Sequence, residues 1–245
     1  MQSTLQLFFP GKLIIGNGCL QQLQEEVIDK NYRRVFLMTI EPLKAALTEM
    51  LEAWQQKGIG VEIYTAIVQE PSFADFATVM KTATPFDPDV VIGTGGGSVL
   101  DVAKLVAAQL HNEQTLSEYV GIGLLKGRKV PLICAPATAG TGSEVSPNAI
   151  LVDPDNQKKG IISPWLVPDQ VYVDPLLTIS VPPAITAATG IDALTHCLEA
   201  YTNKFAQPFI DMFAAEGMRR ISANIVKAVQ QGNDVYAREQ VAMGS

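Results

Sequence analysis

Apolar and polar positions follow two periods in the first part of the chain. In short runs rich in β-branched residues, consecutive positions are apolar, so both faces of a strand would be apolar. This pattern is typical of strands that are buried on both faces of a sheet. Between these runs, apolar residues recur every three to four positions, as on one face of a helix. The alternation predicts a parallel sheet covered by helices on both faces, which is a doubly wound α/β architecture. The expected strands are residues 34–39, 61–68, 89–94 and 130–138, and the expected helices are residues 42–58, 72–83 and 98–110.

The pattern changes after a last short strand, which we expect within residues 168–175. From there to residue 245 the apolar positions keep a helical period, and no further β-rich run follows. We therefore divide the chain into an α/β domain of residues 1–177 and the beginning of an all-helical domain of residues 178–245.

The composition and charge of the chain argue against some classes of function. The chain has 245 residues, of which 47% are hydrophobic and 18% charged, and its formal net charge is −7. An acidic chain without basic clusters is a poor candidate for binding nucleic acid or an anionic membrane. Its three cysteines are scattered, and no apolar run is long enough to span a bilayer, so we expect a cytoplasmic protein without disulfides. Exposed edges of the predicted sheet allow a homodimer.

A glycine-rich turn follows the third expected strand. In the stretch TGGGSVLDVAK, residues 94–104, Gly95, Gly96 and Gly97 precede Ser98, near which the next helix begins. Glycine lets a ligand approach the main chain, and the free N–H groups at a helix N-terminus bind phosphate. This turn predicts a pyrophosphate site. The alternative is a tight strand-to-helix turn without a ligand.

A second loop rich in glycine and hydroxyl groups follows the next expected strand. The stretch PATAGTGSEVS, residues 136–146, carries the hydroxyl groups of Thr138, Thr141 and Ser143. Both loops leave the carboxyl ends of parallel strands, where ligands bind in open α/β sheets. Together they predict a nucleotide site, although a cluster of ordinary turns remains the alternative.

An acid and an imidazole share one face of a helix in the last part of the chain. Asp192 and His196 are four residues apart in TGIDALTHCLEAY, and this spacing allows both to bind one divalent metal. Glu199 lies close to the same face as a group that could orient the ring. A simple hydrogen bond on the helix surface is the alternative, because two ligands do not complete a metal site. The other histidine, His111, is expected to be a surface or capping residue.

Four motifs in this order and spacing resemble the iron-dependent (group III) alcohol dehydrogenases. They are GTGGGSVLDVAK, PATAGTGSEVS, SPWLVPDQVYVDP and TGIDALTHCLEAY, and the resemblance extends from FPGKLIIGNG to REQVAMGS. It implies a Rossmann-like dinucleotide-binding domain followed by a helical domain, with substrate and metal between them. It also implies a reaction in which the metal polarises the oxygen of a small primary alcohol or aldehyde while hydride passes to or from the nicotinamide of NAD or NADP.

The resemblance also assigns roles to individual residues. The glycine turn would hold the pyrophosphate, Thr138 and Thr141 would contact the phosphates or the nicotinamide side, and Lys158 would reach the cofactor. Asp192 and His196 would be the catalytic metal ligands, the first two of four, for Fe²⁺ or alternatively Zn²⁺. The residues expected to bind the cofactor are Gly95, Gly96, Gly97, Ser98, Asp101, Thr138, Thr141 and Lys158.

Three departures from the family pattern leave alternatives open. Ile40 stands where an aspartate often holds the adenosine ribose, so NADP stays as open as NAD. Glu70 stands where many members carry asparagine. The chain also ends at Ser245, before two further metal-binding histidines, so we expect a truncated form that is inactive by itself. The alternatives are a metal-independent reductase of a carbonyl acid of the maleylacetate type and a nucleotide-binding fragment without chemistry.

Overall fold

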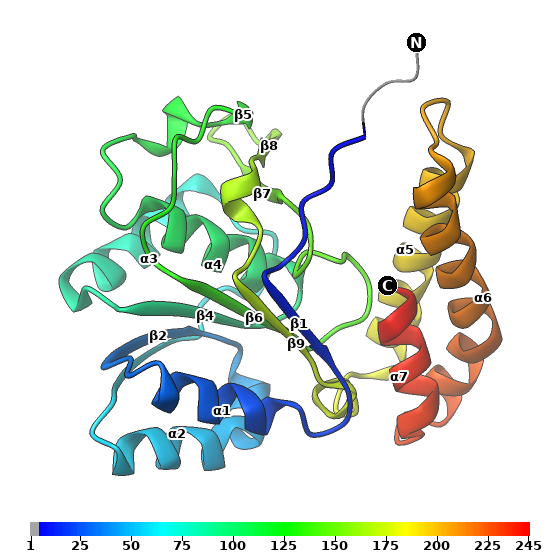
Figure 1. Ribbon diagram of the computed structural model, residues 1–245, viewed down its shortest axis with the longest axis horizontal. Coiled ribbons are helices and arrows are strands. Elements are labelled where there is room, and N and C mark those ends of the chain that lie inside the picture. The colour runs from blue at the N-terminus through cyan, green and yellow to red at the C-terminus, as the bar shows by residue number, and fades with distance from the viewer. Residues whose placement is uncertain (1–4) are drawn as a thin grey trace.

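Six parallel strands form the central sheet, in the order β1-β9-β6-β4-β2-β3 (Figure 1). The computed structural model describes residues 5–245. The four strands between the two edges are short and almost wholly buried, as the apolar runs predicted. In spatial order the strands are β1 (Lys12–Ile15), β9 (Gln170–Val173), β6 (Leu132–Pro136), β4 (Val90–Gly95), β2 (Arg34–Met38) and β3 (Gly60–Tyr64).

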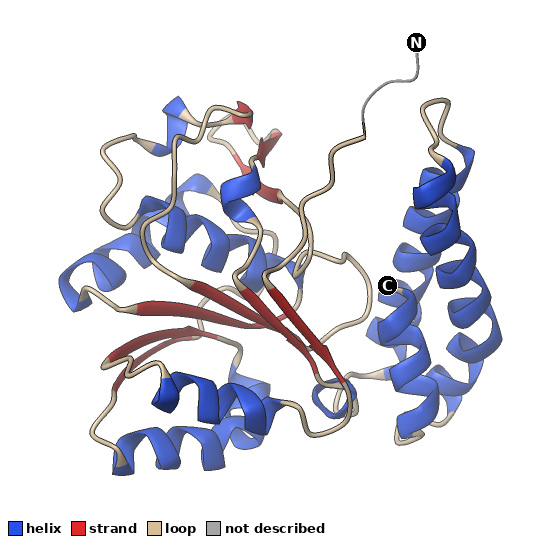
Figure 2. Ribbon diagram, viewed as in Figure 1, coloured by secondary structure: helices blue, strands red, loops and turns tan. Residues whose placement is uncertain are grey.

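Helices cover both faces of this sheet (Figure 2). Alternate side chains of β2 point to opposite faces: Val35 and Leu37 pack with α1 and α2, whereas Phe36 and Met38 pack with α3 and α4. The sheet therefore separates two apolar cores, and the predicted α/β fold is confirmed. The covering helices are α1 (Leu20–Asp29), α2 (Thr48–Gln56), α3 (Phe73–Phe86) and α4 (Gly97–Gln109).

Most of the expected elements differ from the structure by one to three residues at their ends, and two of them differ more. Residues 65–68 were expected in a strand, but β3 ends at Tyr64. Among residues 5–245, β3 pairs with β2 alone, and the last hydrogen bond of this ladder runs from the Thr39 amide to the Tyr64 carbonyl, so residues after Tyr64 have no strand in this part of the chain to pair with. The helix expected over residues 42–58 begins as a 3₁₀-helix, η1 (Glu41–Leu47).

A small second sheet was not expected from the sequence. Its strands β7 (Asn148–Val152) and β8 (Lys158–Ile162) form an antiparallel hairpin, and β5 (Gly121–Ile122) pairs with β8. The strands are half-exposed, β8 contains Gly160 and β5 has two residues, so their apolar signal is weak. Three further 3₁₀-helices lie in connections: η2 (Leu116–Glu118), η3 (Pro164–Leu166) and η4 (Pro175–Thr178).

Three helices form the last part of the chain, beside the α/β part (Figure 1). They are α5 (Pro183–Thr202), α6 (Pro208–Gln230) and α7 (Val235–Gly244), which confirms that this part is helical. Glycine lets α6 and α7 touch, because a Cβ at Gly217 would lie 2.8 Å from the Gly244 carbonyl oxygen. The division at residues 177 and 178 remains a proposal. Within residues 5–245, no helix is long and apolar enough to cross a membrane.

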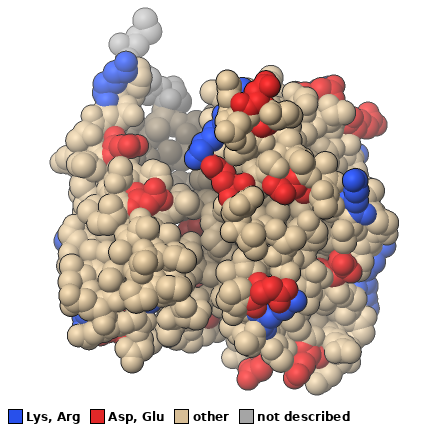
Figure 3. All heavy atoms as spheres, turned by 180° about the vertical axis from the view of Figure 1, so that it is seen from behind, with Lys and Arg blue, Asp and Glu red and all other residues tan. Residues whose placement is uncertain are grey.

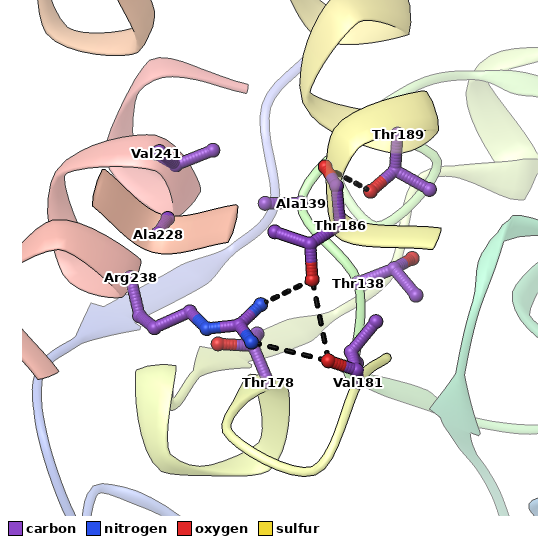
Figure 4. A pocket seen from close by; sticks show the side chains of 9 residues that line it. All are labelled: Thr138, Ala139, Thr178, Val181, Thr186, Thr189, Ala228, Arg238 and Val241. Atoms are coloured by element: carbon purple, nitrogen blue, oxygen red, sulfur yellow. Dashed lines mark hydrogen bonds between the residues drawn. The ribbon is translucent and has the colours of Figure 1, made fainter. Parts of the chain in front are cut away.

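A buried arginine on α7 joins the helices to the segment that leaves the sheet. Figure 4 shows the Arg238 guanidinium between Thr186 and Val181, to which it donates hydrogen bonds of 2.6 and 3.1 Å. A third bond of 2.9 Å runs to the Gly232 carbonyl. Burial lowers the pKa of Arg238, but a guanidinium stays charged at neutral pH. The cavity beside it has about 10 Å³, the space of one water molecule, so this junction is packing rather than a ligand pocket.

We expect Arg238→Ala to lower the free energy of unfolding by roughly 2–4 kcal/mol, because three acceptors lose a charged donor and a buried volume empties. Urea denaturation followed by circular dichroism measures this change. The control is Arg219→Ala on α6, whose side chain is 64% exposed, and it should change stability little. Equal losses in both variants would contradict the role assigned to Arg238.

Candidate functional site

A cleft of about 730 Å³ opens at the carboxyl ends of β4 and β6 and extends to α5. Its size is in the range of small-molecule and cofactor sites. It gathers most of the residues singled out in the sequence, although they come from distant parts of the chain. The expected cofactor and metal residues that line it are Gly96, Gly97, Ser98, Asp101, Thr138, Thr141, Lys158, Asp192 and His196, and Ile40, Glu70 and Ser143 line it as well.

The glycine turn places a bare helix N-terminus in the cleft. Strand β4 ends at Gly95, Gly96 is the extended residue before the helix, and α4 begins at Gly97, one residue earlier than expected. No side chain of the described residues caps this end. The first amides of α4 are therefore available to an anion, and the helix dipole favours negative charge there. A Cβ at Gly97 would lie 2.7 Å from Thr141 Oγ1, so only glycine leaves the two loops this close.

Gly95 differs from its expected place. It is buried, it does not line the cleft, and its carbonyl accepts a hydrogen bond of 2.8 Å from the Ala137 amide. A Cβ there would lie 2.9 Å from the Val99 side chain. Gly95 thus allows α4 to pack closely over the end of β4, whereas Gly96 and Gly97 face the open space.

Asp101 lines the cleft, but its carboxylate is already engaged by the protein. It accepts a short hydrogen bond from the Ser143 hydroxyl and one of 2.9 Å from the Ile150 amide. Burial raises the pKa of Asp101, and the Lys104 ammonium and these two donors oppose that rise. The structure therefore indicates that Asp101 holds the second loop and β7 against α4. Direct contact of Asp101 with a cofactor stays a prediction.

Lys104 is a central residue that the sequence reasoning did not single out. It is fully buried, and its ammonium donates to the carbonyl oxygens of Ser146 at 3.1 Å and Asn148 at 2.8 Å, with Asp101 Oδ1 at 3.8 Å. Burial lowers the pKa of Lys104, and the Asp101 carboxylate counters this effect. The available signal was a lysine within the predominantly apolar residues 99–108, with Asp101 three residues earlier, because an ion buried there must have partners.

Helix α5 carries Asp192 and His196 to the far side of the cleft. The second loop touches this helix closely, because a Cβ at Gly140 would lie 3.1 Å from the Thr189 carbonyl oxygen. Asp192 Oδ2 and His196 Nδ1 are 3.7 Å apart, and both side chains are about half exposed, at 46% and 55%. Among residues 5–245, no group of three or more histidine, cysteine or acidic side chains could hold a metal ion. The pair is thus an incomplete metal site in the described chain.

The neighbours of that pair on α5 have other surroundings. Cys197 points into the helical core, with its thiol 3.5 Å from the Gly244 carbonyl oxygen, as expected for a packing residue. Glu199 is exposed, and the carboxylate that lies beside the His196 imidazole belongs to Asp192 rather than to Glu199. His111 lies elsewhere, with Nε2 3.1 Å from Asp87 Oδ1.

The sides of the cleft differ in polarity. Ile40, Ile67 and Val68 give one side an apolar surface near the end of β2. At its rim the Lys158 ammonium contacts Glu70 Oε1 at 2.6 Å. In the space-filling view of Figure 3, acidic and basic side chains are interspersed on the visible face. The arrangement can hold an anion through main-chain amides, place apolar and hydroxyl groups around it, and offer two ligands to a cation.

Comparisons with known proteins match both parts of the chain. The family model for iron-containing alcohol dehydrogenase matches residues 10–175, and the model for the C-terminal part of the Fe-containing alcohol dehydrogenase family matches residues 186–245. A long-chain-alcohol dehydrogenase 1 from Geobacillus thermodenitrificans is 38% identical over 99% of this chain and 62% of its own length.

Solved structures give the same result. A 1,3-propanediol oxidoreductase superposes with a TM-score of 0.93 at 30% identity over 99% of this chain and 64% of that chain. A sulfoacetaldehyde reductase from Bifidobacterium kashiwanohense, solved in complex with NAD⁺, gives 0.89 at 26% identity over 99% of this chain and 65% of that chain.

The chain therefore spans about 62% of the length of the long-chain-alcohol dehydrogenase that it resembles. The matching family model covers most of the α/β part, and the second model covers nearly all of the helical part. The protein belongs to the iron-containing alcohol dehydrogenase family.

Proposed function

We propose that this chain contributes the cofactor site and part of the metal site of an NAD(P)-dependent oxidoreductase that interconverts a small primary alcohol and its aldehyde. The observation that carries the proposal is that one cleft contains both the uncapped N-terminus of α4 and the Asp192–His196 pair. A cytoplasmic location and a homodimer belong to the same proposal. The names of the relatives, which include long-chain-alcohol and 1,3-propanediol enzymes, support the reaction class.

The residues present fit a dinucleotide. Space for a diphosphate exists at Gly96 and Gly97 because neither carries a Cβ, and the hydroxyl groups of Thr138 and Thr141 line the same space. The first amides of α4 would hold the phosphates. Ile40 offers no carboxylate to repel a 2′-phosphate, so the proposal covers both NAD and NADP. The sulfoacetaldehyde reductase solved with NAD⁺ supports the nicotinamide class of cofactor.

The residues also fit a divalent cation in part. Carboxylate and imidazole ligands suit Fe²⁺ and also Zn²⁺, and the family name favours iron. When bound, the cation polarises the substrate oxygen and the nicotinamide exchanges the hydride. The chain would orient both groups: α5 directs Asp192 and His196 toward the glycine turn, and the apolar side formed by Ile67 and Val68 would keep water from part of the cleft.

We expect the chain to bind NAD or NADP and Gly97→Ala to weaken that binding about tenfold or more, because the new methyl group would collide with Thr141 and displace a hydroxyl group that lines the cleft. Isothermal titration calorimetry with each cofactor measures this. The control is Gly127→Ala, whose new Cβ has no atom within 4 Å. Absence of binding by the wild-type chain at millimolar cofactor would refute the cofactor site.

His196→Ala should remove most of the Zn²⁺ or Fe²⁺ binding of the chain, because the Asp192 carboxylate would be the one ligand left of the pair. The chain offers a matched control in His111→Ala, because His111 is its other histidine and lies outside the cleft. Metal titration by calorimetry distinguishes the two variants. Undiminished metal affinity in His196→Ala would favour a nucleotide-binding module without metal chemistry.

Activity tests the reaction itself. We expect no turnover by the chain alone, whose metal site is incomplete among the described residues. In a full-length form of the protein, nicotinamide absorbance, followed over a panel of primary alcohols with Fe²⁺ or Zn²⁺ and with NAD or NADP, should report turnover that a chelator abolishes. Turnover that survives complete chelation would instead favour the metal-independent carbonyl-acid reductase.

A further inference from the structure

Lys158 is the sole lysine or arginine that lines the cleft among the described residues. The other charged side chains there are the carboxylates of Glu70, Asp101 and Asp192. An anionic ligand in the cleft would thus meet main-chain amides and one exposed ammonium group. That cation is already in contact with a carboxylate, since Lys158 Nζ and Glu70 Oε1 are 2.6 Å apart.

The backbone brings these two residues together. Lys158 is paired with Val152 across the hairpin, and Val152 forms a bridge to Ser72. The Val152 amide also donates to the Pro71 carbonyl at 2.9 Å. Glu70 lies just before this joint, so its carboxylate faces Lys158 from the loop that follows β3. The Lys158–Glu70 ion pair therefore joins the hairpin of β7 and β8 to the loop between β3 and α3.

This ion pair is not needed to hold the hairpin. Main-chain bonds at Pro71, together with the Asp101 and Lys104 contacts to Ile150 and Asn148, already fasten β7. The side chains of Lys158 and Glu70 are 68% and 46% exposed, and exposed ion pairs contribute little to stability. Such a pair is weak enough for a ligand to break. The ammonium is a compact charge, so a phosphate and Glu70 would compete for it.

We propose that Glu70 lowers the affinity of the cleft for phosphate-bearing cofactors by holding Lys158 in an ion pair that the cofactor must break. The inference rests on the proposed function, because it takes a dinucleotide as the ligand. It identifies Glu70 as a residue that sets cofactor affinity through its contact with Lys158 and not through contact with the reacting atoms. The phosphate that competes is either the diphosphate common to both cofactors or the 2′-phosphate of NADP.

The test is a double-mutant cycle on cofactor binding, measured by calorimetry with NAD and with NADP. Glu70→Gln should bind about two- to fivefold more tightly than the wild type, and Lys158→Gln should bind more weakly. In the Lys158→Gln background, Glu70→Gln should lose most of its gain. Raising the salt concentration should shrink the gain in the single variant. Melting temperatures should stay unchanged.

A control variant and a comparison of the two cofactors complete the test. Glu52→Gln removes the same charge from an exposed position on α2 outside the cleft, and it should leave cofactor affinity unchanged. An equal gain with both cofactors assigns the competition to the diphosphate, whereas a gain with NADP alone assigns it to the 2′-phosphate.

Unchanged or weaker binding by Glu70→Gln overturns the inference, as does an equal gain in the Lys158→Gln background. If the wild-type chain binds neither cofactor, the proposed function fails and this inference fails with it. If the wild type binds and Gly97→Ala weakens binding while Glu70→Gln has no effect, only the role of Glu70 fails.

Discussion

The cleft depends on a buried charge on helix α4. Lys104 has no exposed surface, so its ammonium must be satisfied inside the protein, and the carbonyl groups of Ser146 and Asn148 do so. Asp101, one turn earlier, takes hydrogen bonds from Ser143 and Ile150. Together the two side chains tie the second loop and the start of β7 to the helix whose N-terminus faces the cleft. Loss of either partner would leave a buried charge poorly compensated, which is why we regard this pair as a constraint on the site.

Close main-chain approach supplies the second constraint. The glycine turn, the second loop and α5 meet at points where a Cβ would collide with a neighbour: Gly97 against Thr141, and Gly140 against Thr189. These contacts bring the face of α5 that carries Asp192 and His196 to the same cleft as the first amides of α4. The glycines therefore have separate tasks, since Gly95 permits packing of α4 over β4, Gly97 permits the approach of Thr141, and both Gly96 and Gly97 line the cleft.

The charges within the cleft are compatible with the anionic cofactor that we propose for this acidic protein. The uncapped amides and the dipole of α4 would supply most of the attraction, and Lys158 adds a charge that a carboxylate already contacts. At the rim of the cleft the side chains are exposed and their ion pairs contribute little to stability, so a substitution there would change the proposed cofactor affinity with little effect on the fold. At the buried Lys104–Asp101 pair, by contrast, the same change of charge would disturb the fold.

The sequence by itself determined the α/β architecture, the helical last part, the position of the glycine turn and the pairing of Asp192 with His196, because these follow from local periodicity and short spacings. It did not reveal the hairpin of β7 and β8, whose half-exposed strands carry a weak pattern. Nor did it separate Gly95 from Gly96 and Gly97, or give Lys104 its partners. Only the tertiary structure decided these points, because each depends on contacts between segments that are far apart in the chain, where the pattern of neighbouring residues carries no information.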